Sequence, residues 1–167
     1  MKSLTPERAA EVAAYVMAHW RYDPDTGLVY GRANRPIGTK TTNGGLQAMA
    51  RTSAGVTSVL LHRAAWLLRT GRWPEFEIDH ENGNRADNRW RNLRSATRGQ
   101  NRQNLSPRGK SGHLRGCTPY YQKWKAQIRV DGTHHYLGLF DTEEQAHAAY
   151  CEAKKRLHIF NPVQRPA

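Results

Sequence analysis

The chain has 167 residues, and its 26 Lys and Arg outnumber its 14 Asp and Glu, for a formal net charge of +12. This length is enough for one ordinary domain or two small ones. Such an excess of positive charge favours nucleic acid as the partner. A membrane is not favoured, because no apolar run approaches the roughly 18 residues of a spanning helix and no long basic amphipathic helix is present.

Targeting signals and cysteine spacing point to an intracellular, cytoplasmic protein. The first thirty residues lack the apolar core of a secretory signal. Cys117 and Cys151 are 34 positions apart and form no CxxC pair, so we expect reduced thiols and no structural zinc site.

The N-terminal segment predicts a helix. Thr5, Pro6 and Glu7 have the character of an N-cap, a first-position proline and a first-turn acid, and the helix should continue to about His19. Five apolar residues are expected on one face, namely Ala9, Val12, Ala13, Val16 and Met17.

The next segment predicts a small antiparallel sheet followed by a helix. We expect a turn over 22–27, a short strand over 28–30 and further strands over 46–50 and 55–61. A helix should begin at Leu61 and end at Gly71, a residue suited to close a helix in a left-handed conformation. His62 on this helix is expected to pack or to bind phosphate.

Residues 77–104 carry the densest chemistry in the chain. Glu77 to His80 predicts a strand, Glu81 to Asn88 a loop rich in Asn, and Trp90 to Thr97 a second strand. A helix should follow over 98–104 with Thr97 as its N-cap. The segment therefore predicts a compact ββα hairpin.

This hairpin suits phosphodiester hydrolysis. An imidazole such as His80 can take a proton from water when it is held in one orientation. A carboxylate beside it, together with an amide oxygen from the following helix, suits a hard cation such as Mg²⁺.

Asp79-His80, Asn92 twelve positions after the His, and Asn101 nine positions later resemble the HNH (His-metal finger, ββα-metal) nuclease motif. The version found in phage homing endonucleases is the most similar. The resemblance implies that His80 is the general base, that Asn92 orients the loop around it, and that Asp79 and Asn101 bind the metal. The sequence has Asn101 where the motif's name has His. The segment YDPDTGLVY at 22–30 also resembles one that precedes the HNH core in such nucleases.

Between positions 85 and 104 the sequence has six arginines and a single acidic residue, Asp87. We interpret them as phosphate contacts, although a solvated basic face is the alternative. They are Arg85, Arg89, Arg91, Arg94, Arg98 and Arg102.

The C-terminal part predicts three strands and one helix. After a basic linker at 106–112, Trp124 to Val130 alternates in polarity, Asp131-Gly132 predicts a hairpin turn, and 133–140 the return strand. In that strand His134 and Tyr136 should share one face, and His135, Leu137 and Leu139 the other. The first strand is expected over 114–118. A helix beginning near Thr142 should bury an apolar stripe of Ala146, Ala149, Tyr150, Ala153 and Leu157.

The stretches LRG at 114–116, WKAQIR at 124–129 and YLGLFDTEE at 136–144 together resemble the AP2 DNA-binding domain. That resemblance implies a sheet that lies on DNA. The DNA-facing positions would be Arg115, Thr118, Gln127, Arg129, His134 and Tyr136. Base readout and nonspecific phosphate binding are the two alternatives for this face.

As a whole, the sequence predicts an α+β chain. Its expected parts are an HNH nuclease domain over 1–105 (core about 77–104), a linker over 106–112, an AP2-like domain over 113–160 and a tail over 161–167. We expect an endonuclease that uses Mg²⁺ or Mn²⁺ and no small-molecule cofactor, acts on double-stranded DNA, and is a monomer or a dimer. A monomer with one site would nick. The alternatives are a sequence-specific DNA-binding regulator with an inactive nuclease core, and cleavage of RNA.

Overall fold

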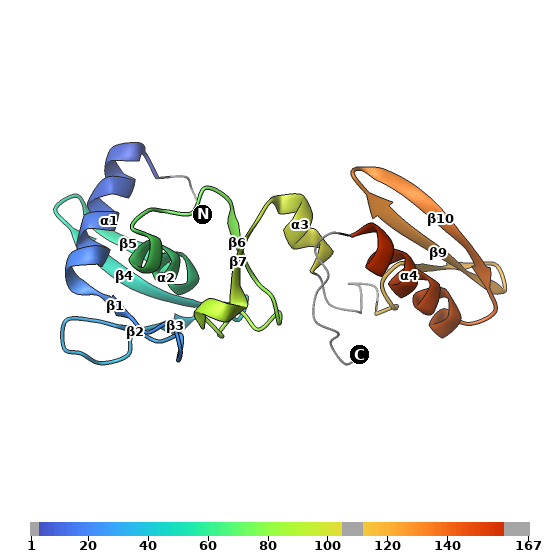
Figure 1. Ribbon diagram of the computed structural model, residues 1–167, viewed down its shortest axis with the longest axis horizontal. Coiled ribbons are helices and arrows are strands. Elements are labelled where there is room, and N and C mark those ends of the chain that lie inside the picture. The colour runs from blue at the N-terminus through green and yellow to red at the C-terminus, as the bar shows by residue number, and fades with distance from the viewer. Residues whose placement is uncertain (1–3, 105–111, 159–167) are drawn as a thin grey trace. The chain divides into compact units, whose positions relative to one another are not determined.

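The computed structural model describes residues 4–104 and 112–158, so most of the predicted linker and the whole predicted tail lie outside the described residues. The chain divides into two compact units, 1–96 and 97–167, which are described separately (Figure 1). None of the helices in the described ranges is long and apolar enough to cross a membrane.

The N-terminal unit combines two helices with small antiparallel sheets. Strands β3, β4 and β5 form one sheet in that order, β1 pairs with β2, and β6 pairs with β7. The elements are α1 (Pro6–His19), β1 (Arg21–Tyr22), β2 (Val29–Tyr30), β3 (Thr39–Lys40), β4 (Leu46–Thr52), β5 (Gly55–Leu60), α2 (Leu61–Thr70), β6 (Glu77–His80), a 3-10 turn (Trp90–Asn92) and β7 (Leu93–Ala96).

Helix α1 begins as predicted, because the Thr5 hydroxyl accepts a hydrogen bond from the Arg8 main-chain nitrogen and Pro6 occupies the first turn. Val12 and Val16 are completely buried. The prediction for Met17 was wrong, since this side chain is 50% exposed. The buried stripe runs at i, i+4 spacing from Val12 through Val16 to Trp20, which turns Met17 away from the core.

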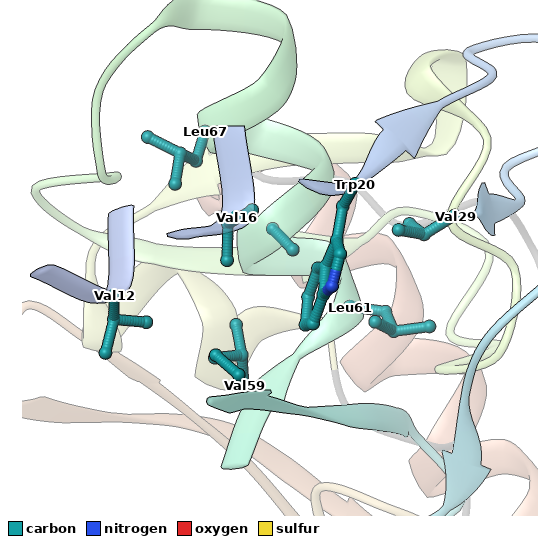
Figure 2. Close-up of a cluster of buried hydrophobic side chains, with 9 residues drawn as sticks. Val12, Val16, Trp20, Val29, Val59, Leu61 and Leu67 are labelled. Carbon is teal, nitrogen blue, oxygen red and sulfur yellow. The ribbon is translucent and has the colours of Figure 1, made fainter. Parts of the chain in front are cut away.

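The main core of this unit lies between the two helices and the β3–β4–β5 sheet. Figure 2 shows Trp20 of the segment after α1 beside Val16, Val29, Val59 and Leu61. Helix α2 ends as predicted at Gly71, whose φ of 76° is left-handed and whose N–H donates to Leu67 over 2.8 Å. Helix α2 also lies beside the β6–β7 hairpin.

The β6–β7 hairpin packs on α2 through Ile78 and Leu93, which cluster with Ala65. In its register Asp79 faces Arg94 and His80 faces Leu93. The second strand was predicted from Trp90, but residues 90–92 form a 3-10 turn and the strand begins at Leu93. The N–H of Asn92 bonds to the carbonyl of Arg89 within that turn, so it does not join the ladder.

The C-terminal unit contains a short helix, a three-stranded antiparallel sheet in the order β10-β9-β8, and a longer helix. Its elements are α3 (Arg98–Gln103), β8 (Cys117–Tyr120), β9 (Lys123–Val130), β10 (Thr133–Phe140) and α4 (Glu143–Leu157). Helix α3 has the expected Thr97 cap, and Gln100 completes a capping box. The predicted nuclease domain included this helix, which the structure groups with the C-terminal unit.

The first strand of this sheet begins later than predicted, at Cys117 instead of Leu114. Gly116 precedes it with a left-handed φ of 84° and lies against the ring of Tyr150 on α4. A Cβ at Gly116 would lie 2.8 Å from the Cβ of Tyr150, and closer still to the ring. The Gly116 backbone therefore takes a left-handed conformation that fits it against the helix, and its carbonyl already accepts a hydrogen bond from the N–H of Gln127 on β9 over 2.9 Å.

Strand β10 contains a bulge that overturns one predicted face. Tyr136 pairs with Gln127, and Gly138 pairs with the very next β9 residue toward its N-terminus, Ala126, so Leu137 is the extra residue. Leu139 then pairs with Lys125 and is 41% exposed, on the same face as Tyr136. It had been predicted on the opposite face.

Helix α4 packs on the sheet face opposite to Tyr136 and Leu139. Its contacts are made, as predicted, by Ala146, Ala149, Tyr150 and Ala153. Leu157 was also expected in this stripe but is 42% exposed. It is the last residue of the helix. Within residues 112–158, the sheet thus has one face covered by α4 and one helix-free face.

Candidate active site

Asp79 and His80 lie at the end of β6, and both are nearly buried, with 6% and 5% of their surfaces exposed. Alternation along a strand turns adjacent side chains to opposite faces. The two residues consequently have different partners. Asp79 meets the neighbouring strand, and His80 meets the loop that follows β6.

Asp79 forms an ion pair with Arg94 directly across the β6–β7 ladder. Its Oδ2 accepts a hydrogen bond from Nε of Arg94 over 2.9 Å and lies 2.8 Å from Nη2. A guanidinium this close holds the nearly buried carboxylate in one orientation. Arg94, which was predicted to contact DNA, therefore has a carboxylate partner inside the site.

Asn92 ties together the two ends of the loop. Its Oδ1 accepts from the main-chain nitrogen of Asn82 over 2.9 Å, and its Nδ2 donates to the carbonyl of Asp87 over 2.7 Å. The main chain of Asn92 also accepts a hydrogen bond from the N–H of Glu81. These contacts are the kind that the predicted orienting role requires.

Within the loop, polar side chains replace a regular hydrogen-bond ladder. The Asn82 side chain accepts from the N–H of Asn84 and donates to Asp87. Asp87 also binds Arg89, with Nε of Arg89 2.7 Å from Oδ1, and this pairing lowers the pKa of the Asp87 carboxyl to about 2. Arg89, like Arg94, is a predicted DNA contact that here pairs with a carboxylate.

His80 is held by two side chains that sequence reasoning did not connect with it. Nε2 of His80 lies 3.0 Å from Oδ1 of Asn88, and Asn88 is only 1% exposed. The His62 ring of α2 meets the His80 ring edge to face, with centroids 5.1 Å apart and an interplanar angle of 87°. Burial lowers the pKa of His80, and burial with the nearby His80 lowers the pKa of His62 to about 3. His62 is consequently neutral at physiological pH and packs, so it does not offer a positive charge to phosphate.

The backbone beside Asn88 is braced by the turn between β1 and β2. The Tyr22 hydroxyl donates to the carbonyl of Asn88 over 2.8 Å, and the Trp90 N–H donates to the carbonyl of Pro24 over 2.9 Å. Gly27, with a left-handed φ of 76°, approaches the main chain of Asn88 and Arg89. Burial raises the pKa of the Tyr22 hydroxyl, which keeps it protonated as a donor. The segment YDPDTG therefore shapes the loop that faces His80.

The other arginines of the predicted set present their side chains to solvent. Arg85 is exposed, and its guanidinium reaches the carbonyl of Asn43 over 3.4 Å. Arg91 is exposed in the 3-10 turn, and Arg98 and Arg102 are exposed on α3. These four retain the exposure that phosphate contact requires.

The helix-free face of the C-terminal sheet gathers most of the residues predicted to face DNA. Arg129 pairs with His134 and Gln127 with Tyr136 across the β9–β10 ladder, and Thr118 pairs with Lys125 across β8 and β9. Direct partners share a face, so these side chains lie on one surface with the addition of Leu139. Arg115 lies outside this sheet, since it precedes β8, and its carbonyl is 2.8 Å from Nδ1 of His147.

The predicted metal ligands fall in different units, because Asp79 is on β6 and Asn101 is on α3. Across residues 4–104 and 112–158, no three His, Cys, Asp or Glu side chains are grouped as ligands. A hard cation that keeps most of its waters needs only one or two protein ligands, so a carboxylate and an amide oxygen have the right chemistry for it. The pairing of Asp79 with Asn101 stays a prediction.

Two of the comparisons with known proteins found a match. The family model for HNH endonuclease matches residues 59–103, from the end of β5 to α3. A solved structure described as "DNA binding and cleavage by the HNH homing endonuclease I-HmuI" aligns at 22% identity and a TM-score of 0.46, covering 56% of this chain and 55% of that one. The alignment thus spans about half the length of that protein. No match was found among curated proteins. Residues 59–103 are therefore similar to the HNH endonuclease family.

Proposed function

We propose that this chain is a metal-dependent endonuclease that hydrolyses phosphodiester bonds in duplex DNA, as a site-preferring homing-type or nicking enzyme. The observation that carries the proposal is the buried, doubly held His80 inside the matched HNH segment. A general base needs a fixed orientation and a pKa below the working pH. Asn88 and His62 hold the His80 ring, and burial lowers its pKa.

In this proposal the chain's residues divide the work of hydrolysis. His80 takes a proton from the attacking water, and Asn92 keeps the adjoining loop in position. Asp79 and Asn101 would hold a divalent cation, Mg²⁺ or Mn²⁺. When bound, such an ion neutralises the scissile phosphate and the developing charge on the leaving oxygen. Arg94 orients Asp79 through its ion pair.

Duplex DNA is the proposed substrate because both units present exposed basic side chains. Arg85, Arg91, Arg98 and Arg102 would contact phosphates near the cut. The helix-free face of the C-terminal sheet, which we propose is an AP2-like module, would add Thr118, Gln127, Arg129, His134 and Tyr136. Arg115, before β8, and the paired Arg89 and Arg94 are weaker candidates for direct contact. A single site cuts one strand, so a monomer would nick and a dimer would be needed for a concerted double-strand break.

The experiment that tests the activity is incubation of supercoiled plasmid with the protein in Mg²⁺, Mn²⁺ or EDTA. The wild type should convert plasmid to open circle only with metal, and His80→Ala should abolish this. His135→Ala is the matched control, because His135 is an exposed histidine outside the proposed site. Equal cutting by wild type and His80→Ala would overturn the proposal.

A DNA-binding regulator with an inactive nuclease core is the second candidate. One observation favours it: Arg94 engages the same Asp79 carboxylate that a metal would use. Tight DNA binding by the wild type without cleavage in either metal, on a library of target sequences, would favour the regulator.

A further inference from the structure

The buried amide of Asn88 makes one side-chain hydrogen bond within the described part of the chain, and that bond goes to His80. Its Oδ1 lies 3.0 Å from Nε2 of His80, while its Nδ2 is buried with no partner there. A buried polar group costs free energy unless its hydrogen bonds are made. A role in shaping the loop would not explain why the Asn88 amide is buried with a single side-chain hydrogen bond, made to the proposed base His80.

The loop does not depend on the Asn88 side chain for its shape. The main-chain carbonyl of Asn88 accepts a hydrogen bond from the Tyr22 hydroxyl, and the Asn88 main chain lies against Gly27. Asn92 supplies the bonds that join the loop ends at Asn82 and Asp87. The backbone of Asn88 is thus fixed by other groups, and its side chain remains available to act on the imidazole.

The direction of this bond decides which nitrogen of His80 is basic. A neutral imidazole carries its proton on one nitrogen and its lone pair on the other. The carbonyl oxygen of Asn88 can only accept, so the Nε2 that faces it carries the proton and the lone pair lies on Nδ1. The edge-to-face contact with His62 holds the plane of the same ring from α2.

We infer that Asn88 is a positioning residue that fixes His80 in the Nε2-protonated tautomer and makes Nδ1 the nitrogen that receives the proton from water, an inference that rests on the proposed nuclease function. His62 restrains the ring plane, and the turn over 22–27 holds the Asn88 backbone in register with His80. The surroundings of His80 are therefore built from three separate parts of the N-terminal unit.

The test is long-range ¹H–¹⁵N correlation NMR of the metal-free, ¹⁵N-His-labelled full chain in mildly alkaline buffer, which distinguishes a protonated from an unprotonated ring nitrogen. His80 of the wild type should show protonated Nε2 and unprotonated Nδ1. Asn88→Leu, of similar size and without an acceptor, should give mixed tautomers. Asn88→Asp keeps an acceptor and should restore Nε2 protonation.

Nicking kinetics supply the second measurement. Asn88→Leu should lower kcat about 10- to 100-fold, the range found for partners that orient active-site groups, with little change in KM for DNA. Asn84→Leu is the matched control, since Asn84 is an exposed Asn of the same loop whose side chain caps Ala86 and does not reach His80. It should leave the His80 tautomer unchanged.

Two results would overturn the inference. One is a wild-type spectrum with the proton on Nδ1, which needs no variant and holds even if both Asn88 variants fail to fold. The other is an Asn88→Leu protein with the wild-type tautomer and kcat. A wild type that never cuts DNA refutes the proposed function instead, because the tautomer is measured without metal or DNA.

Discussion

Gly27 is in backbone contact with Asn88: a Cβ added to Gly27 would lie 2.6 Å from the carbonyl carbon of Asn88. Gly27→Ala should therefore combine the strain of a left-handed φ of 76° with a steric clash, and destabilise the protein by more than about 1 kcal/mol. Chemical denaturation measures this. Gly44→Ala is the control, because Gly44 has a φ of 79° but no atom within 4 Å of the added Cβ. Equal losses in the two variants would show that the contact with Asn88 is unimportant.

Replacing His62 with Phe should change how stability depends on pH. The pKa of His62 falls from 6.5 to about 3 on folding, so the unfolded chain binds its proton first as the pH drops. The free energy of unfolding of the wild type should therefore fall as the pH drops from about 6.5 to about 3, with a slope of at most about 1.4 kcal/mol per pH unit for one proton. His62→Phe keeps a ring against His80 and removes that slope. Denaturation midpoints measured across this range in both proteins test it, and parallel curves would contradict the neutral, buried state of His62.

Arg94 and Arg91 should respond differently to replacement by Met, although both were predicted to contact DNA. Arg94→Met removes hydrogen bonds to the Asp79 carboxylate, at a cost to stability of about 1.5–3 kcal/mol. Arg91→Met, on an exposed side chain, should leave stability nearly unchanged. Arg91→Met should instead make the fall of the logarithm of the DNA-binding constant with the logarithm of salt concentration less steep, by about 1 unit of slope. Filter binding over a salt series would show the opposite pattern if Arg94 were the phosphate contact.

The helix-free face of the C-terminal sheet can be tested by one pair of arginines. Arg129→Ala should weaken DNA binding, because Arg129 is exposed on that face opposite His134. Arg156→Ala, in the last turn of α4, removes the same charge from the helix that covers the other face. Competition with an unrelated duplex separates base readout from phosphate contact, since only the former changes the preference between sequences. Equal losses in both variants would indicate a nonspecific charge effect.

Local signals predicted much of the fold. Thr5 with Pro6, Thr97 with Gln100, and Gly71 define helix ends through short-range chemistry, and all three helix boundaries agree with the structure. Met17 and Leu157 were misplaced because apolar periodicity does not show where a stripe runs out. Strand starts were predicted less well, since the strands expected from Trp90 and Leu114 begin at Leu93 and Cys117.

The site was less predictable than the fold. Asp79 and His80 could be located because the spacing to Asn92 and Asn101 resembles a known motif. The partner of His80 could not, because Asn82, Asn84, Asn88 and Asn92 lie in one short loop and have the same local preferences. Tertiary contacts with His80, Tyr22 and Gly27 distinguish Asn88. The bulge in β10 had a signal, Gly138 inside a strand, that could have been used.

That bulge lets the strand carry one residue more than regular pairing needs without changing the faces of the residues beyond it. Deleting Leu137 would leave Tyr136 opposite Gln127, Gly138 opposite Ala126 and Leu139 opposite Lys125, so the strand would alternate regularly in the same register. Leu139 would stay exposed, and Phe140 would stay beside Trp124. The deletion would remove the packing of Leu137 against the core under α4. A chain that lacks this residue could therefore present the same outward surface as this one.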